Sequence, residues 1–195
     1  KEGLASYSLL VFVSPNGNYE DHTKTASVPV GKAAPGTALR THRVALGGAD
    51  VEGAERIVVK GAQLKSPQVY DSSFLVEAYL KTEPGESSGT IIAKTDGTNG
   101  WALTINAEGV PEFTVYAGSA AHVLGGTRAI NDGSWHHVLA ELDRPNGRMV
   151  LYLDGVQHVQ AACSLPAGSS LANNADLMAG RGMACTFEFL RMALG

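Results

Sequence analysis

The sequence has few charged residues and no long apolar run. Lysine, arginine, aspartate and glutamate make up 17% of its 195 residues, against about a quarter in an average soluble protein. The 15 lysines and arginines are scattered singly, and 19 acidic residues outnumber them. Because a duplex-binding protein gathers its basic residues on one face, we expect no nucleic-acid partner. The longest nearly apolar run, residues 4–13, has about half of the roughly twenty residues that span a bilayer, so we expect no membrane span.

Helical patterning is also lacking. No stretch of about twelve residues repeats its apolar side chains at helical spacing, and a single turn at 171–175 is the only helix that we expect. Hydrophobic residues nevertheless make up 44% of the chain, and 23 glycines and 8 prolines separate short runs of β-branched and aromatic residues. This pattern predicts an all-β domain with a substantial core.

These short runs predict the strands. One of them, residues 73–81, alternates with period two, so its side chains divide between a core face and an outward face. The core set is Phe74, Val76, Ala78 and Leu80, and the outward set includes Glu77 and Lys81. Asp154-Gly155 is a two-residue hairpin signal, because a type I′ turn needs positive φ. The predicted strands are 8–13, 43–46, 56–60, 73–81, 90–94, 101–106, 112–116, 136–142, 149–153, 157–160, 176–179 and 185–193.

The first forty residues differ from the rest. Residues 14–40 are rich in Ser, Thr, Pro, Gly and Asn, which predicts a long irregular loop. We expect residues 1–40 to be an N-terminal strand and loop that belong to the domain or lead into it, and residues 41–195 to be the domain itself. The chain begins at Lys1 and not at methionine, so we expect a module cut from a longer protein.

Two consecutive segments have the pattern of a known family. Residues 133–143, GSWHHVLAELD, and residues 147–155, GRMVLYLDG, resemble the paired-strand signature of laminin-G-like domains, which belong to the concanavalin A-like lectin/glucanase superfamily. The segments 74–81, 91–105 and 177–192 resemble further strands of that family, so the resemblance extends from about Thr41 to Gly195. It implies an all-β, two-sheet antiparallel jelly-roll sandwich.

The resemblance also implies a structural calcium ion, which some relatives bind. The candidate oxygen ligands are Asp50 and Glu188, with Asp96 and Asp132 as further candidates. Glu188 stands where the family commonly has aspartate, and its extra methylene changes the reach of the carboxylate.

The resemblance bears on the cysteines as well. Laminin-G-like relatives often bridge their late strands, so we expect a disulfide between Cys163 and Cys185, the two cysteines of the chain. Two buried thiols in a reducing compartment are the alternative.

The residues give little support to catalysis. Retaining glycosidases of the superfamily use two carboxylates at a spacing of two on one strand. Glu141 and Asp143 have that spacing, but a turn follows them at once. His136 and His137 are adjacent, so on a strand they point to opposite faces and cannot grip one metal together. We therefore expect no enzyme.

Recognition of a ligand is the expected role. Exposed aromatic side chains stack on sugar rings, and polar side chains bind the hydroxyls. Strand position places Phe74, Trp135, Phe187 and Phe189 in the core and favours the core for Trp101 too. The loops 96–100 and 118–126, with the residues beside them, nevertheless predict a ligand site at Asp96, Asn99, Trp101, Tyr116, His122 and Arg128.

Together these features predict a noncatalytic recognition module of a larger secreted or cell-surface protein, monomeric in isolation, with carbohydrate as the leading ligand. The first alternative is a structural or protein-interaction module that packs against neighbouring domains of the parent protein. The second alternative is a glycoside hydrolase or lyase.

Overall fold

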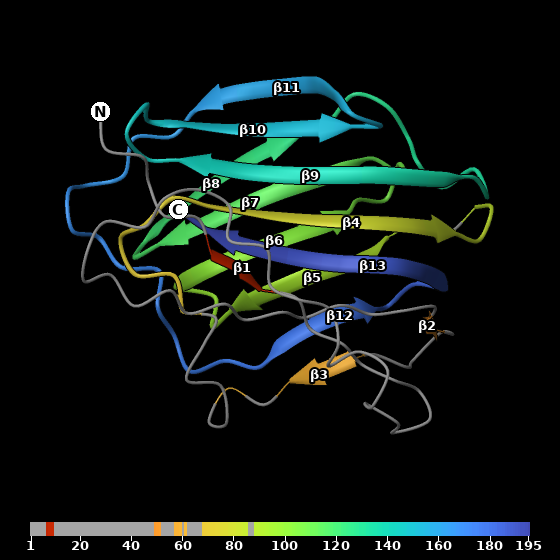
Figure 1. Ribbon diagram of the computed structural model, residues 1–195, viewed down its shortest axis with the longest axis horizontal. Coiled ribbons are helices and arrows are strands. Elements are labelled where there is room, and N and C mark those ends of the chain that lie inside the picture. The colour runs from red at the N-terminus through yellow and green to blue at the C-terminus, as the bar shows by residue number, and fades with distance from the viewer. Residues whose placement is uncertain (1–6, 10–48, 52–56, 60, 62–67, 86–87) are drawn as a thin grey trace.

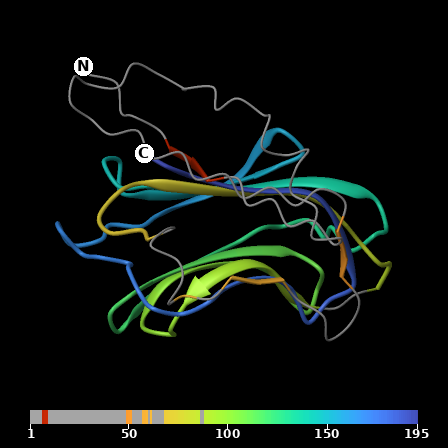
Figure 2. The ribbon, with the colours of Figure 1, turned by 60° about the horizontal axis from the view of Figure 1, so that its bottom comes forward.

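The computed structural model describes residues 7–9, 49–51, 57–59, 61, 68–85 and 88–195. These residues form two antiparallel β-sheets that pack face to face, as Figures 1 and 2 show from two directions, and they contain no α-helix. The predicted two-sheet sandwich is therefore confirmed.

The seven-stranded sheet lies nearer the viewer in Figure 1. Its strand order is β1-β13-β4-β9-β10-β11, and β2 also pairs with β13. The bounds are β1 Tyr7–Leu9, β2 Ala49–Val51, β4 Phe74–Thr82, β9 Trp135–Asp143, β10 Arg148–Leu153, β11 Val156–Ala162 and β13 Cys185–Leu194.

The six-stranded sheet lies behind it, with the order β3-β12-β5-β6-β7-β8. The bounds are β3 Ile57–Val59, β5 Gly89–Thr95, β6 Asn99–Ile105, β7 Pro111–Ala117, β8 Ala120–Gly125 and β12 Leu177–Arg181.

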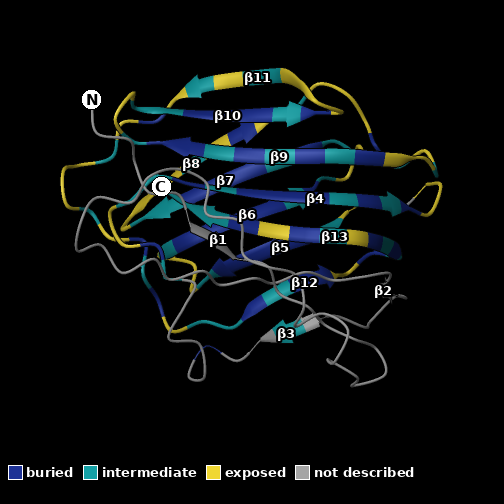
Figure 3. Ribbon diagram, viewed as in Figure 1, coloured by how far each residue is buried: buried dark blue, intermediate teal, exposed yellow. Residues whose placement is uncertain are grey.

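The core fills the space between the two sheets, and the buried segments in Figure 3 follow the strands. On β4 the predicted inner set of Phe74, Val76, Ala78 and Leu80 is buried. Across the sandwich the Phe74 ring packs against Trp101 of the other sheet, with centroids 5.6 Å apart. Each such aromatic side chain removes a large apolar area from water, which is the main stabilising term of a sandwich.

Some elements differ from the sequence-based predictions. Residues 120–125, within a predicted loop, form the strand β8, and residues 49–51 form the unpredicted strand β2. Strand β2 has only three residues, and β8 begins with two alanines, which have a low strand propensity. Only residues 7–9 of the region around the first predicted strand are described; the run 43–46 and the loop 14–40 lie outside the described residues.

The predicted helical turn at 171–175 is wrong, because this segment has no regular secondary structure. Its conformation follows from Asn173, which is buried and whose amide nitrogen donates to the carbonyls of Lys94, Asn99 and Leu171. The Asn173 side-chain oxygen accepts the backbone N–H of Ala175 at 3.0 Å. Within this segment, the Asn173 side chain thus bonds the carbonyl of Leu171 and the N–H of Ala175, which a helical turn would pair through the backbone.

Lys94 holds the same segment from the inner face of β5. Its Nζ donates to the carbonyl oxygen of Ala175 at 2.7 Å, and its side chain is buried. Burial lowers the pKa of Lys94, and the nearby Asp176 carboxylate partly opposes this effect. The ammonium group therefore has a carbonyl and a carboxylate to compensate for its removal from water.

The predicted disulfide is wrong, because Cys163 and Cys185 are not bonded to each other. Cys163 donates its N–H to Gly147, beyond the end of β9 that pairs with Phe74. Cys185 pairs with Thr82, at the far end of β4. The length of β4 separates them, roughly 25 Å at about 3.3 Å per residue, whereas a disulfide needs Cα atoms within about 7 Å.

Replacing Asn173 with alanine is expected to destabilise the fold by about 2 to 4 kcal/mol, because several buried carbonyls lose their donor. Urea unfolding followed by tryptophan fluorescence measures this change. The exposed neighbour Asn174 is the matched control, and Asn174→Ala should change the free energy of unfolding by less than about 0.5 kcal/mol. Equal stability of the two variants would contradict the assigned role of Asn173.

Candidate binding surface

The outer face of the seven-stranded sheet carries the candidate site. The pairing of β9, β4 and β13 arranges its outward side chains in four rows across the sheet, because directly opposed residues project to the same side. From one end of the strands to the other, the rows are Trp135, Lys81 and Thr186; His137, Tyr79 and Phe189; Leu139, Glu77 and Arg191; and Glu141, Leu75 and Ala193.

Three aromatic rings form a stack in the first two rows. The Tyr79 ring lies between Trp135, at a centroid distance of 5.1 Å and an interplanar angle of 25°, and Phe189, at 6.1 Å and 29°. We call Trp135, Tyr79 and Phe189 the aromatic platform. The Trp135 side chain is 37% exposed, so the platform offers a large aromatic surface to solvent beside its stacked partner.

Two of these rings contradict the sequence-based assignment to the core. Trp135 precedes the inward-facing His136 on β9, so the period of two turns it outward. For Phe189 the reason is a β-bulge: Phe187 pairs with Leu80 and Phe189 with the next residue, Tyr79, so Glu188 is an extra residue. The bulge places Phe187 inside and Phe189 outside. Phe74, Phe187 and Trp101 are buried in the core as predicted.

A buried acid lies next to the platform. Glu77 is only 2% exposed although it is on the outer face. Its carboxylate contacts His137 Nε2 at 2.8 Å and also forms an ion pair with Arg191. The side chains of His137 and Arg191 remain 29% and 45% exposed, so both can still bond a molecule that lies on this face. Glu77 thus fixes the orientation of two exposed polar groups.

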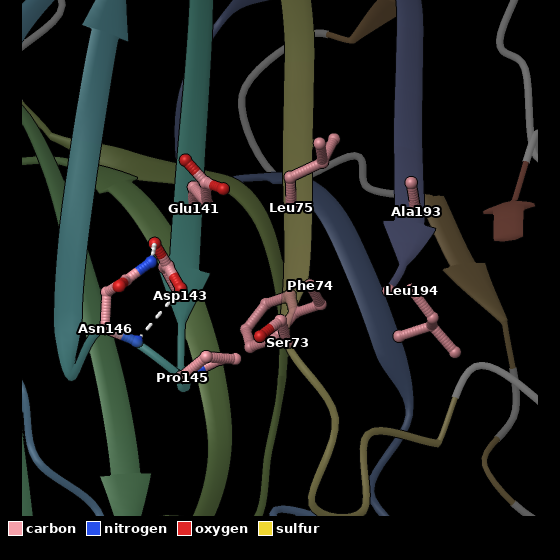
Figure 4. A pocket seen from close by; sticks show the side chains of 10 residues that line it. Ser73, Phe74, Leu75, Glu141, Asp143, Pro145, Asn146, Ala193 and Leu194 are labelled. Atoms are coloured by element: carbon pink, nitrogen blue, oxygen red, sulfur yellow. Dashed lines mark hydrogen bonds between the residues drawn. The ribbon is translucent and has the colours of Figure 1, made fainter. Parts of the chain in front are cut away.

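A pocket of about 420 Å³ lies at the opposite end of the same face. Figure 4 shows the side chains that line it. Its walls come from the start of β4, the end of β9, the following turn and the end of β13. Leu75, Pro145 and Leu194 supply apolar surface, and Ser73, Glu141 and Asn146 supply polar groups.

Asp143 also lines this pocket, but it is committed to the turn. Asn146 donates to it through its side chain at 2.7 Å, and Arg148 Nε donates at 2.9 Å. The bond from Asn146 and the bond and charge of Arg148 lower the pKa of Asp143, although burial opposes them. Asp143 is therefore held as an anion. In the carboxylate pair of Glu141 and Asp143, Asp143 thus has a structural role in the turn.

A second polar cluster fixes the loop that leads into Trp135. His136 is buried, and its ring nitrogens lie 3.1 Å from Asp132 Oδ1 and 3.1 Å from Asp154 Oδ2. Arg128 Nη2 pairs with the same Asp154 oxygen at 3.1 Å. Asp154 occupies the predicted hairpin turn with a φ of 52°, and it accepts the N–H of His137. The cluster therefore ties the loop before β9 to the turn after β10.

The pKa of both carboxylates in this cluster is lowered. For Asp154, burial would raise the pKa, but the bonds from His137 and His136 and the charges of His136 and Arg128 outweigh it. For Asp132, the backbone N–H of Ser134 is the main cause and His136 the second.

The predicted ligand site is divided by the fold. Asp96 and Asn99 lie in the β5–β6 turn, where the Asp96 carboxylate accepts the N–H of Thr98 and of Asn99. Tyr116, opposite Gly100, lies at the same end of the six-stranded sheet. Of the six predicted residues these three come together, so this turn region remains a predicted site.

The side chains of the other three predicted ligand residues do not join this group. Trp101 is wrong as a ligand residue, since it is 1% exposed and packs in the core. His122 pairs with the buried Val115 and so is on the inner side of the edge strand β8. Arg128 follows β8, at the other end of β7, and pairs with Asp154.

The described residues contain no group of three or more His, Cys, Asp or Glu side chains that could hold a metal ion. Glu188 is exposed at the bulge of β13. Asp50 lies on β2 opposite Thr186, but its side chain is outside the described part of the structure. A calcium ion bound by Asp50 and Glu188 stays a prediction. Within the described ranges there is also no helix of the length and apolarity needed to cross a membrane.

The two-sheet antiparallel sandwich defines the class of the protein. Residues 59–190 match the family described as the concanavalin A-like lectin/glucanases superfamily. The chain belongs to this superfamily, and the predicted resemblance is confirmed. A comparison with curated protein sequences gives no significant match.

Solved structures share the fold at low sequence identity. The CBM40 domain of Ruminococcus gnavus IT-sialidase is 14% identical at a TM-score of 0.58, with 77% of this chain and 90% of that chain covered. Domains LG4-5 of the mouse laminin alpha1 chain are 16% identical at 0.58, with 83% and 45% covered. The binding domain of botulinum neurotoxin DC, solved with rat synaptotagmin II, is 14% identical at 0.52, with 63% and 32% covered. The chain thus spans about a third of that domain.

Replacing Asp154 with asparagine is expected to lower the free energy of unfolding at pH 7 by about 1 kcal/mol. Asparagine tolerates the positive φ of this position. The expected effect is small because about a third of the Asp154 side chain is exposed, so solvent screens its ion pairs. The lowered pKa means that the stabilisation is present above the pKa of the unfolded chain and is lost as the pH falls through the folded value. The difference from wild type should therefore shrink in acid.

Urea unfolding at pH 7 and at successively lower pH measures both parts of this expectation. The exposed turn residue Glu108 provides the control, since Glu108→Gln should unfold like wild type throughout. A deficit of Asp154→Asn that stays constant down to strongly acidic pH would refute the ionic role of Asp154.

Proposed function

We propose that this domain is a noncatalytic carbohydrate-binding module and that the outer face of the seven-stranded sheet holds the sugar. The observation that carries the proposal is the aromatic platform, in which the partly exposed Trp135 is backed by Tyr79 and Phe189. An aromatic ring in a fixed orientation offers a flat apolar surface on which the C–H face of a pyranose can stack.

The polar groups beside the platform suit the hydroxyls of a sugar. His137 and Arg191 are partly exposed and are held in place by the buried Glu77. A few polar groups in fixed positions give orientation and specificity to a site whose affinity comes from apolar contact. The arrangement therefore combines stacking with directed hydrogen bonds on neighbouring strands.

The structural relatives support this proposal. One solved form of the CBM40 domain is bound to alpha2,3 sialyllactose, and the neurotoxin relative is a binding domain. We propose a secreted or cell-surface location for the parent protein, since laminin is among the relatives. At these identities each name describes the relative itself, and only the fold is common.

A protein-interaction module is the first alternative. Such a role would favour a broad apolar patch on the surface. Among the described residues the large exposed apolar side chains lie at separate places: Tyr70 precedes β4, Val123 is on β8, Trp135 begins β9, and Val156 begins β11. The aromatic platform is the feature that favours a sugar over a protein partner.

A glycoside hydrolase or lyase is the second alternative. The nearest carboxylate pair is Glu141 and Asp143, and Asp143 is bound to Asn146 and Arg148. A retaining glycosidase needs one of its two carboxyl groups as a proton donor and the other as a nucleophile. The donors that occupy Asp143 favour the noncatalytic role.

Affinity electrophoresis tests the proposal with gels that contain hydroxyethylcellulose, laminarin, xylan, galactomannan, polygalacturonate or heparin. We expect retardation by at least one of these polysaccharides. Trp135→Ala should weaken the affinity about thirtyfold, which corresponds to roughly 2 kcal/mol for the loss of an aromatic anchor. A repeat with calcium and with a chelator tests the predicted calcium ion.

The matched control is Tyr116→Ala, which removes an aromatic side chain from the outer face of the other sheet. It should leave the retardation unchanged. The converse result, a loss of binding in Tyr116→Ala alone, would move the site to the β5–β6 turn, and no retardation on any gel would refute carbohydrate binding.

A further inference from the structure

The aromatic platform and the pocket lie on one face of one sheet. Trp135 begins β9 and Asp143 ends it, and this strand has nine residues. At about 3.3 Å per residue, the two ends are roughly 25 Å apart. This span exceeds a disaccharide and requires several sugar units in a row.

Rows of outward side chains fill the distance between the two ends. The rows of Leu139, Glu77 and Arg191 and of Glu141, Leu75 and Ala193 connect the platform to the pocket. Ala193 is the smallest side chain of these rows, and it lies at the edge of the pocket. Three neighbouring strands, each about 4.8 Å from the next, give this band the width of a single extended chain.

The charges at the pocket end limit the kind of ligand. Asp143 is matched by Arg148. Glu141 has the Tyr152 hydroxyl at 3.5 Å and, within the described part of the chain, no cationic partner. Uronate or sulfate groups would be repelled by this carboxylate, whereas neutral hydroxyls can donate to it. The apolar walls of Leu75, Pro145 and Leu194 suit the C–H face of a sugar ring.

We infer that the ligand is an extended, uncharged saccharide chain that lies along β9 and β4, with one unit on the aromatic platform and another in the pocket. The inference rests on the proposed function and adds the class of ligand. The domain would bind internal units of a neutral polysaccharide chain and not the sugar at its end. The platform and the pocket then act as two subsites of a single chain.

Isothermal titration calorimetry with oligosaccharides from disaccharide to hexasaccharide tests the inference. The series is prepared from the polysaccharide that retards the domain. The hexasaccharide should bind at least about tenfold more tightly than the disaccharide, because it alone reaches both subsites. Ala193→Phe, which puts a large ring at the pocket, should weaken the hexasaccharide about tenfold and leave the short ligands unchanged.

Trp135→Ala should weaken all lengths, since every ligand uses the platform. Ala107→Phe is the matched control for the added ring, because Ala107 is exposed in the turn after β6, and it should bind like wild type. Thermal unfolding of Ala193→Phe within a few degrees of wild type shows that the fold is intact. If that variant is unfolded, Glu141→Ala takes its place and should show the same loss for the long ligands.

Three results would overturn the inference and leave carbohydrate binding in place. These are retardation by heparin or polygalacturonate alone, equal affinity for all chain lengths, and full hexasaccharide affinity in the folded pocket variant. Absence of retardation by every polysaccharide would instead remove the proposed function itself, and the inference with it.

Discussion

The pairing of β9, β4 and β13 is the constraint on which the rest of the structure depends. Once Phe74, Val76, Ala78 and Leu80 are buried against the other sheet, the side chains between them must lie on the outer face of their own sheet. The antiparallel pairing then brings the outward residues of three strands into common rows. The strands that bury the core residues on one face therefore present the candidate site on the other face, and the core packing fixes the positions of the site residues.

Much of this architecture could be predicted from the sequence. The alternation on β4, the turn at Asp154-Gly155 and the strand pair around it are local patterns, and local patterns determine which face a side chain takes. The opposite orientations of His136 and His137 also follow from this rule, and the structure has His136 buried and His137 partly exposed. The superfamily could be recognised because its signature lies in this most regular part of the chain.

The site itself was harder to predict. Trp135 was assigned to the core from its position on the predicted strand, but its neighbour His136 takes the inner position. The assignment of Phe189 failed because one extra residue reverses the alternation, and no turn residue marks it. The outward orientation of Trp135 could have been predicted from the residues that follow it. Val138, Ala140 and Leu142 alternate with outward residues, and this alternation extended backwards places Trp135 outside.

The bulge at Glu188 has a consequence for variation in this strand. Arg191 faces Glu77 and Met192 faces the core only because one residue is unpaired upstream of them. If Glu188 paired with Tyr79 and the bulge closed, these two side chains would exchange, which would place a guanidinium in the sandwich and a thioether on the surface. Loss of Glu188 itself would keep the register, because Phe189 would then follow Phe187 directly and still pair with Tyr79. The register between β13 and β4 therefore decides which side chains of β13 reach the candidate site.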